Sequence, residues 1–273
     1  MTLDAWVRAH PFLEPLARLE ARIDASIEAS AVTPPSVPAW SDYREDFAAG
    51  VPLLHSPSAG IDLEPAAGAI ARVTARLAAD PLDRGDDMRV VAEEVTALPA
   101  PRLIDWLLGD DDREASRPGP LRHVGWLVMA AWLKPVVAEF DACRDDDRWL
   151  RRYCPTCGSL PAMAQLLGSD PGRRRFLSCG CCGTRWRYSR TGCPFCEVEA
   201  HRLASLGVDG EGGLRIDYCE SCRAYLKTYD GHGSEDVFLA DWTSLHLDLA
   251  ARDRGLQRAA ASLYDLDSTS APH

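Results

Sequence analysis

Four Cys-x-x-Cys pairs in one stretch of the chain decide how this sequence folds. They read Cys154-Pro155-Thr156-Cys157, Cys179-Gly180-Cys181-Cys182, Cys193-Pro194-Phe195-Cys196 and Cys219-Glu220-Ser221-Cys222. The first two pairs are separated by 21 residues and the last two by 22, and a shift of 39 or 40 positions places the first couple on the second. An internal repeat of this kind predicts two similar small modules.

The spacing has a chemical reason. Two thiolates with two residues between them can bind one metal ion where the backbone turns tightly, and a second such knuckle completes a tetrahedral four-sulfur shell. A module of about 40 residues has little core, so a bound ion would supply folding energy. The candidate ligands are Cys154, Cys157, Cys179, Cys182, Cys193, Cys196, Cys219 and Cys222.

The pairing of the cysteines is open at this stage. The repeat favours sequential use, with the first two pairs on one ion and the last two on another, while a cross-braced pattern would join the first pair to the third. Disulfides or a thioredoxin-type redox pair are less suitable, because the chain shows no export signal and repeats the motif four times.

Strand-like stretches flank the knuckles, as expected for a zinc-ribbon or rubredoxin-like unit. Residues 175–178 precede Cys179, and residues 214–218 alternate apolar and polar side chains up to Cys219. Residues 185–188 and 224–227 follow the second knuckle of each module. Gly158 and Gly183 can adopt positive φ after their knuckles, whereas Glu197 and Arg223 stand at these positions in the second module, so its knuckles are expected to differ somewhat.

Three further side chains have weaker links to metal. Cys181 lies inside the second knuckle and is interpreted as a non-ligand, although a Cys179/Cys181 pair stays open. Cys143 is predicted to be a small core residue near the end of an apolar helix. The histidines show no metal spacing, and His201 is at most a reserve ligand.

Composition limits the classes of function. The chain has 273 residues, 46% of them hydrophobic, and a formal net charge of −11, which disfavours a nucleic-acid partner. The longest uncharged apolar run, residues 124–133, is too short for a membrane span. The N-terminal residues lack a signal-peptide layout, so we expect a cytoplasmic protein with reduced thiols.

Charge is distributed unevenly along the chain. Residues 151–235 hold 12 Lys/Arg and 9 Asp/Glu, while the rest holds 18 and 32. Two interpretations stay open. The guanidinium groups could offset anionic tetrathiolate sites, or they could form a docking surface for an acidic partner.

The residues outside the cysteine repeat are predicted to be helical. Apolar side chains recur at helical spacing over residues 13–27, and further helices are expected over 41–49, 65–79, 86–98, 101–108 and 121–143, with two more after residue 239. The predicted fold is therefore multi-domain α + small β. An all-α domain (1–150) precedes two tandem four-cysteine modules (151–190 and 191–233) and a C-terminal helical tail (234–273) that packs back on the rest. No phosphate loop or nucleophile–base set is found, so no catalytic residue is assigned.

The motif strings resemble one family. The string from Cys154 to Pro161, Arg175-Phe176-Leu177-Ser178-Cys179, Trp186, Tyr225-Leu226-Lys227 and the tail with Ser244–Asp248, Gly255 and Arg258 are similar to the formate dehydrogenase accessory proteins, the FdhE family. The likeness covers about residues 150–260. The N-terminal half is compatible through its helical character and Gly50-Val51-Pro52-Leu53-Leu54.

The resemblance implies a non-enzymatic cytoplasmic maturation factor. Such a factor would bind the molybdenum-containing catalytic subunit of respiratory formate dehydrogenase before its twin-arginine export, and would be needed for its activity. It also implies one metal ion in each four-cysteine site, bound in rubredoxin-like fashion, with iron favoured and zinc compatible. Two other functions stay open: a rubredoxin-like electron carrier and a nucleic-acid-binding zinc ribbon.

Overall fold

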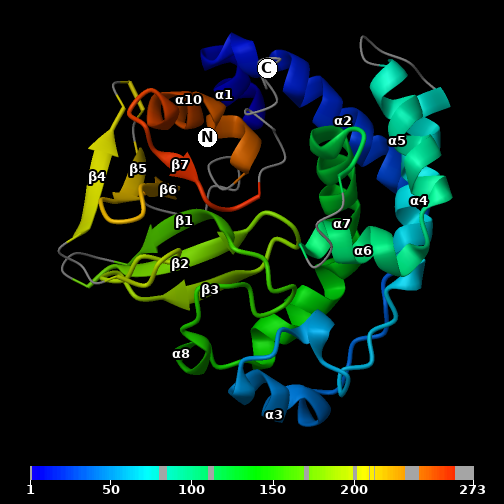
Figure 1. Cartoon of the computed structure of the whole chain (residues 1–273), viewed down its shortest axis with the longest axis horizontal. Coiled ribbons are helices and arrows are strands. Elements are labelled where there is room, and N and C mark those ends of the chain that lie inside the picture. The colour runs from blue at the N-terminus through cyan, green and yellow to red at the C-terminus, as the bar shows by residue number, and fades with distance from the viewer. Residues whose placement is uncertain are drawn as a thin grey trace.

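The computed structural model of the protein describes residues 2–79, 85–109, 114–168, 172–198, 202–208, 210–211, 213–230 and 240–261. Most of the helices form one side of the molecule and a single sheet forms the other (Figure 1). Among the described residues, no helix combines the length and the apolar character that crossing a bilayer requires.

The helices of the first half of the chain include all those predicted there and two short ones, the first and the last, that were not. They are α1 (Leu3–Ala9), α2 (Glu14–Ala29), α3 (Trp40–Ala49), α4 (Glu64–Ala79), α5 (Gly85–Ala97), α6 (Ala100–Leu108), α7 (Pro118–Cys143) and α8 (Asp146–Trp149), with 3₁₀ turns η1 (Pro11–Leu13) and η2 (Leu53–His55). Gly50 and Gly109 end α3 and α6 at φ 85° and 92°, a conformation that costs glycine little. The core of this half includes Trp106, Trp126 and Trp132.

The cysteine repeat forms one continuous sheet. Its strands are β1 (Pro161–Leu167), β2 (Arg174–Cys179), β3 (Arg185–Tyr188), β4 (Leu203–Gly207), β5 (Leu214–Cys219), β6 (Ala224–Tyr229) and β7 (Gln257–Arg258). The order is β3-β2-β1-β6-β5-β4, with β7 also paired to β6. The strands predicted around residues 175–178, 185–188, 214–218 and 224–227 are confirmed.

Each module also has a first strand that was expected to be loop. β1 pairs antiparallel with β2, as β4 does with β5, so both modules are three-stranded. β1 then pairs parallel with β6, with Met163 opposite Lys227. This pairing joins the two modules through their backbones.

The segment after the second module departs from the prediction of two helices. One helix forms, α10 (Leu245–Arg252), after the 3₁₀ turn η4 (Asp241–Ser244). Gly255 then reverses the chain at φ 66°, and residues 257–258 pair with β6 as β7 instead of continuing as helix. The predicted helical residues from 262 onward lie outside the described part of the chain.

A buried set of four charges anchors this segment to β6. Lys227 is fully buried and its Nζ lies 2.7 Å from Asp241 Oδ1 and 2.7 Å from Asp248 Oδ2. Arg258 contacts the remaining oxygens of both carboxylates, at 2.8 and 2.9 Å, and Tyr225 donates a 2.6 Å hydrogen bond to Asp248. Two positive and two negative groups therefore balance inside the protein.

Helix α1 and the turn η1 pack in a second hydrophobic cluster, which lies between the second module and the C-terminal segment. Trp6 and Leu13 pack with Ile216, Tyr225 and Leu247, away from the larger core of the helical half. The Trp6 indole also donates a 2.9 Å hydrogen bond to the carbonyl of Thr243. The N-terminal segment is thus packed on the second module and on the C-terminal segment.

Candidate metal centres

The first four-sulfur cluster is built by two tight turns on neighbouring strands. Cys154 and Cys157 precede β1, while Cys179 ends β2 and Cys182 lies in the turn to β3. Gly158 closes one turn by donating to the Cys154 carbonyl at 3.0 Å, and Gly183 closes the other on Cys179 at 3.2 Å. Both glycines have positive φ, 78° and 74°, as their sequence positions suggested.

The four sulfurs are spaced as metal ligands are. Cys154 Sγ lies 3.5 Å from Cys182 Sγ, and Cys157 Sγ lies 3.3 Å from Cys179 Sγ. Sulfurs placed tetrahedrally about 2.3 Å from one zinc ion are about 3.8 Å apart, whereas a disulfide brings them to about 2.05 Å. All four are free thiols here, so the cluster could hold an ion after a movement of a few tenths of an ångström.

The second cluster repeats this arrangement. Cys193 and Cys222 are 3.8 Å apart, and Cys196 and Cys219 are 3.7 Å apart. The first two pairs thus group together, as do the last two, and the cross-braced alternative is wrong.

The second module keeps the same turns without glycine. Glu197 and Arg223 each adopt φ 60° and donate to the carbonyls of Cys193 and Cys219, both at 2.9 Å. The expected difference between the knuckles is therefore absent from the backbone of these turns. Glu197 and Arg223 instead carry backbone strain, because non-glycine residues disfavour the left-handed region.

The two clusters differ in their access to solvent. All four cysteines of the first cluster are buried. In the second, Cys196 is exposed and Cys222 is partly exposed. The second cluster is therefore the one that a solvent species or another protein can approach.

Burial also shapes the protonation of the first cluster. It raises the pKa of Cys154 and of Cys179 well above the usual thiol value. Burial acts in the same direction on Cys182, but hydrogen bonds from the other three thiols and from Thr184 outweigh it, so the pKa of Cys182 falls well below that value. An incoming ion would thus displace thiol protons, and its affinity should increase with pH.

A segment distant in sequence supports the first knuckle. The amides of Leu53 and Leu54 donate to the carbonyls of Pro155 and Thr156, both at 2.9 Å. The His55 ring lies 3.2 Å from the Cys157 carbonyl. These residues belong to or follow the Gly50–Leu54 stretch, whose support of the knuckle no local pattern had indicated.

The structure also places the two cysteines that are not among the eight candidate ligands. Cys181 is fully buried but is not part of either cluster. Cys143 is exposed at the end of α7, so its assignment to the core is wrong; Phe140 fills the core at that turn instead. His201 lies outside the described residues.

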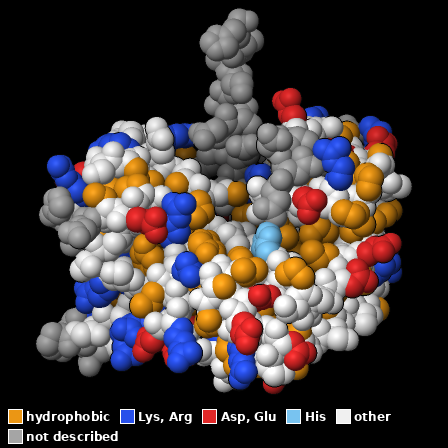
Figure 2. All heavy atoms as spheres, turned by 60° about the horizontal axis from the view of Figure 1, so that its bottom comes forward, with side chains coloured by type: hydrophobic (Ala, Val, Ile, Leu, Met, Phe, Trp, Pro, Cys, Tyr) orange, Lys and Arg blue, Asp and Glu red, His pale blue; other side chains and the backbone are white. Residues whose placement is uncertain are grey.

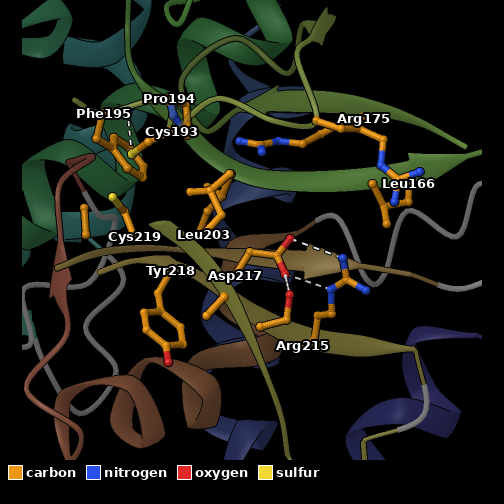
Figure 3. Close-up of a pocket in the computed structure, with 15 residues that line it drawn as sticks. Leu166, Arg175, Cys193, Pro194, Phe195, Leu203, Arg215, Asp217, Tyr218 and Cys219 are labelled. Carbon is orange, nitrogen blue, oxygen red and sulfur yellow. Dashed lines mark hydrogen bonds and ion pairs between the residues drawn. The ribbon is translucent and has the colours of Figure 1, made fainter. Parts of the chain in front are cut away.

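A pocket of about 260 Å³ borders the second cluster (Figure 3). Cys193 and Cys219 lie at one end, and Leu166 and Arg175 lie toward the other. Arg175 is buried and stacks over Tyr188 at 5.5 Å. The pocket thus extends from the second cluster to the strands of the first module.

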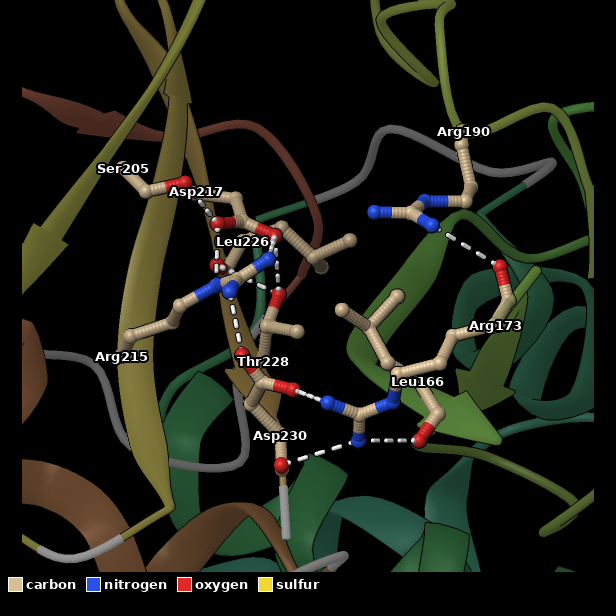
Figure 4. A network of polar contacts seen from close by, with 9 residues as sticks. All are labelled: Leu166, Arg173, Arg190, Ser205, Arg215, Asp217, Leu226, Thr228 and Asp230. Atoms are coloured by element: carbon tan, nitrogen blue, oxygen red, sulfur yellow. Dashed lines mark hydrogen bonds and ion pairs between the residues drawn. The ribbon is translucent and has the colours of Figure 1, made fainter. Parts of the chain in front are cut away.

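Several of the arginines in this region are paired within the protein. Arg173 and Arg215 both contact Asp230, and Arg215 also binds Asp217 at 2.8 Å (Figure 4). Arg187 contacts Asp147. On the face shown in Figure 2, basic and acidic side chains are interspersed around apolar ones. That face lacks the single-sign basic surface that a nucleic-acid-binding module presents.

Parts of this chain are similar to known proteins. A family description, "FdhE, central domain", matches residues 153–190, which hold the first cluster. An FdhE homolog from Aquifex aeolicus is 32% identical over 46% of this chain and 47% of its own length. An FdhE homolog from Pseudomonas aeruginosa is 36% identical over 41% of this chain and 39% of its own.

Over less than half of its length, the chain is similar to FdhE proteins. The resemblance inferred from the motif strings is confirmed. The chain matches less than half of the length of these relatives. A crystal structure of the FdhE protein from Pseudomonas aeruginosa matches at a TM-score of 0.66 and 23% identity, covering 95% of this chain and 91% of that one, and shows that the fold is shared throughout.

Proposed function

We propose that this protein is a non-catalytic accessory factor of the FdhE family, which binds the catalytic subunit of respiratory formate dehydrogenase and is needed for its activity. The proposal includes a cytoplasmic site of action, before the molybdenum-containing subunit is exported by the twin-arginine route. The family relationship supports the link to formate dehydrogenase. The observation that supports a binding role is the pair of rigid four-sulfur clusters on one sheet, one with an exposed edge.

In this proposal each cluster holds one metal ion. The ligands are Cys154, Cys157, Cys179 and Cys182 for the first ion and Cys193, Cys196, Cys219 and Cys222 for the second. Iron is favoured by the family resemblance, and the donor set is equally suited to zinc, since both ions accept four thiolates. When bound, the ion supplies crosslinking energy to modules that bury little core.

The client is proposed to approach the second cluster. Cys196 is exposed there, and the adjoining pocket offers both apolar and charged groups, among them Phe195 and Arg190. The first cluster is enclosed by η2 and the α7–β1 connection, so its role is to stabilise the junction between the helical half and the sheet.

Gene deletion in the native host tests the function. Deletion should abolish respiratory formate oxidation while the client's transcript level stays unchanged, and the wild-type gene should restore it. A tagged copy should retain the catalytic subunit. Normal formate oxidation in the deletion strain would refute the proposal.

Two cysteine variants test the metal sites. Cys154→Ser and Cys193→Ser should each lose about one ion per chain, because a broken shell binds metal far more weakly. Cys143→Ser is the matched control, since that thiol is exposed outside both clusters, and it should retain full metal content. Equal metal content in all three variants would contradict the assignment.

An electron carrier is the second candidate, favoured by the exposed edge of the second cluster at Cys196. Iron in a four-sulfur site can change oxidation state, whereas zinc has no redox chemistry. A zinc-loaded protein that restores client activity as well as the iron form would eliminate this candidate.

A further inference from the structure

A third cluster of potential ligands lies away from the cysteines. It consists of His10, between α1 and η1, Glu211, in the β4–β5 connection, and His246, in the first turn of α10. Their ligand atoms all lie within 4.8 Å of one another. Nε2 of His10 and Nε2 of His246 both lie 2.9 Å from the same oxygen, Glu211 Oε1.

The tautomer of His10 is set by its second nitrogen. Nδ1 lies 3.0 Å from the carbonyl of Trp6, which can only accept, so Nδ1 carries the proton. In the neutral ring Nε2 is then an unprotonated acceptor, and it faces a carboxylate oxygen that is also an acceptor. Two facing lone pairs at this distance require a positive species between them.

The contact of His246 with the same oxygen lacks the geometry of a hydrogen bond. Among the described residues, neither ring nitrogen of His246 has a hydrogen-bond partner, and Glu211 Oε2 has none. The Glu211 side chain is only 8% exposed, so these unpartnered groups are largely shielded from water. Buried polar groups of this kind are costly unless something satisfies them.

We propose that His10, Glu211 and His246 bind a divalent transition-metal ion at a site distinct from the two sulfur clusters. Two imidazoles and one carboxylate are a donor set suited to Zn²⁺ or Fe²⁺. Ligand atoms about 2.1 Å from one ion and 2.9 Å apart subtend an angle of about 90° at it, as adjacent ligands of an octahedral ion do.

The surroundings match those of a metal site. The hydrogen bond from His10 to the Trp6 carbonyl is the orienting contact that metal-bound histidines commonly make through their other nitrogen. The rings of His10 and His246 stack at 5.3 Å, and Phe12 packs edge-on against both. The histidine side chains are 16% and 19% exposed, which leaves water a path to the open positions.

The ion would connect three segments that are far apart in sequence. Helix α1, the β4–β5 connection and α10 meet around one hydrophobic cluster, which contains Trp6 and Leu247. An ion at their junction would fasten the first and last described helices to the second module. The alternative is a histidine–glutamate set that shares a proton and binds no ion.

Cobalt binding to the full chain separates these alternatives. Two equivalents of Zn²⁺ first fill the thiolate clusters, which Co²⁺ displaces poorly because zinc binds such sites more tightly. Co²⁺ is then titrated and followed by absorption and calorimetry. We expect one further equivalent with weak d–d bands and without the thiolate-to-cobalt charge-transfer band. Absence of this equivalent would overturn the proposal.

Two variants and a control locate the ion. Glu211→Gln and His246→Ala should weaken cobalt binding by at least about tenfold, while Glu139→Gln, at an exposed glutamate of α7, should leave it unchanged. Equal binding by Glu211→Gln and the wild type would overturn the proposal.

The wild-type chain gives a test that does not depend on variants folding. With ¹⁵N-labelled histidine, a third equivalent of Zn²⁺ should shift the Nε2 resonances of two of the seven imidazoles. If no imidazole nitrogen responds, the cluster shares a proton and the metal site is refuted.

Discussion

Replacing Lys227 by methionine should strongly destabilise the attachment of the C-terminal segment. Lys227 Nζ has ion-pair contacts of 2.7 Å with both Asp241 and Asp248 and donates a 2.8 Å hydrogen bond to the Asp241 carbonyl. Methionine has a similar volume, so packing changes little. The four buried charges, however, go from a sum of zero to −1.

The size of the effect follows from the uncompensated charge. Removing one partner of a buried ion pair costs about 3–5 kcal/mol, because the remaining charge stays desolvated. Arg258 still contacts both carboxylates, so we expect the lower part of this range for Lys227→Met. Adding Asp248→Asn removes the excess charge and should recover part of the loss.

Urea unfolding of the zinc-loaded chain measures this effect. Trp6 and Trp242 lie in the same hydrophobic cluster and contribute to the fluorescence signal. Lys134→Met, at an exposed position of α7, is the matched control and should change the free energy of unfolding by less than about 0.5 kcal/mol. A loss below about 1 kcal/mol for Lys227→Met would refute the reasoning.

Three further predictions concern the turns and the buried charges. Glu197→Gly should stabilise the second module by up to about 1 kcal/mol in urea unfolding, because glycine tolerates φ 60°. Gly158→Ala and Gly183→Ala should each lose about 1–2 kcal/mol of stability through backbone strain. Gly158→Ala should lose more, because its new Cβ would lie 3.1 Å from His55, whereas a Cβ at position 183 meets nothing within 4 Å. Equal losses would contradict the packing of His55. Burial acts to raise the pKa of Asp241, but Arg258 and Lys227 outweigh it and lower that pKa. The stability that the Asp241 carboxylate contributes is therefore present above its unfolded pKa of about 3.9 and is lost as the pH falls through the lower folded pKa. Asp241→Asn should weaken the loss of stability at acid pH, measured by urea midpoints.

The cysteine sites were predictable because their information is local. Two thiols with two residues between them define each turn, and the repeat indicates how the four turns combine. The positive φ at Gly158 and Gly183 also follows from the residue type. The long helices were predictable for a similar reason, since their apolar periodicity extends over several turns.

Contacts between segments that are far apart in the chain have no local sequence pattern that predicts them. The parallel pairing of β1 with β6 depends on how two complete modules meet, and α1 lies on the second module because Trp6 packs there. Lys227 carries one sequence signal of its contacts, because a lone lysine in a strand without other charges needs buried acidic partners. His10, Glu211 and His246 are separated by 201 and 35 positions, so spacing rules could not group them.

The parallel pairing between β1 and β6 has a consequence for any partner that touches both sulfur clusters. Because Met163 lies directly opposite Lys227 in the ladder, the separation between the two cages is set by main-chain hydrogen bonds and not by a flexible tether. The paired strands therefore hold the two cysteine clusters at a fixed separation. A docking protein must match that span with its own contact points, and an inserted residue in either strand would change the span for every partner at once.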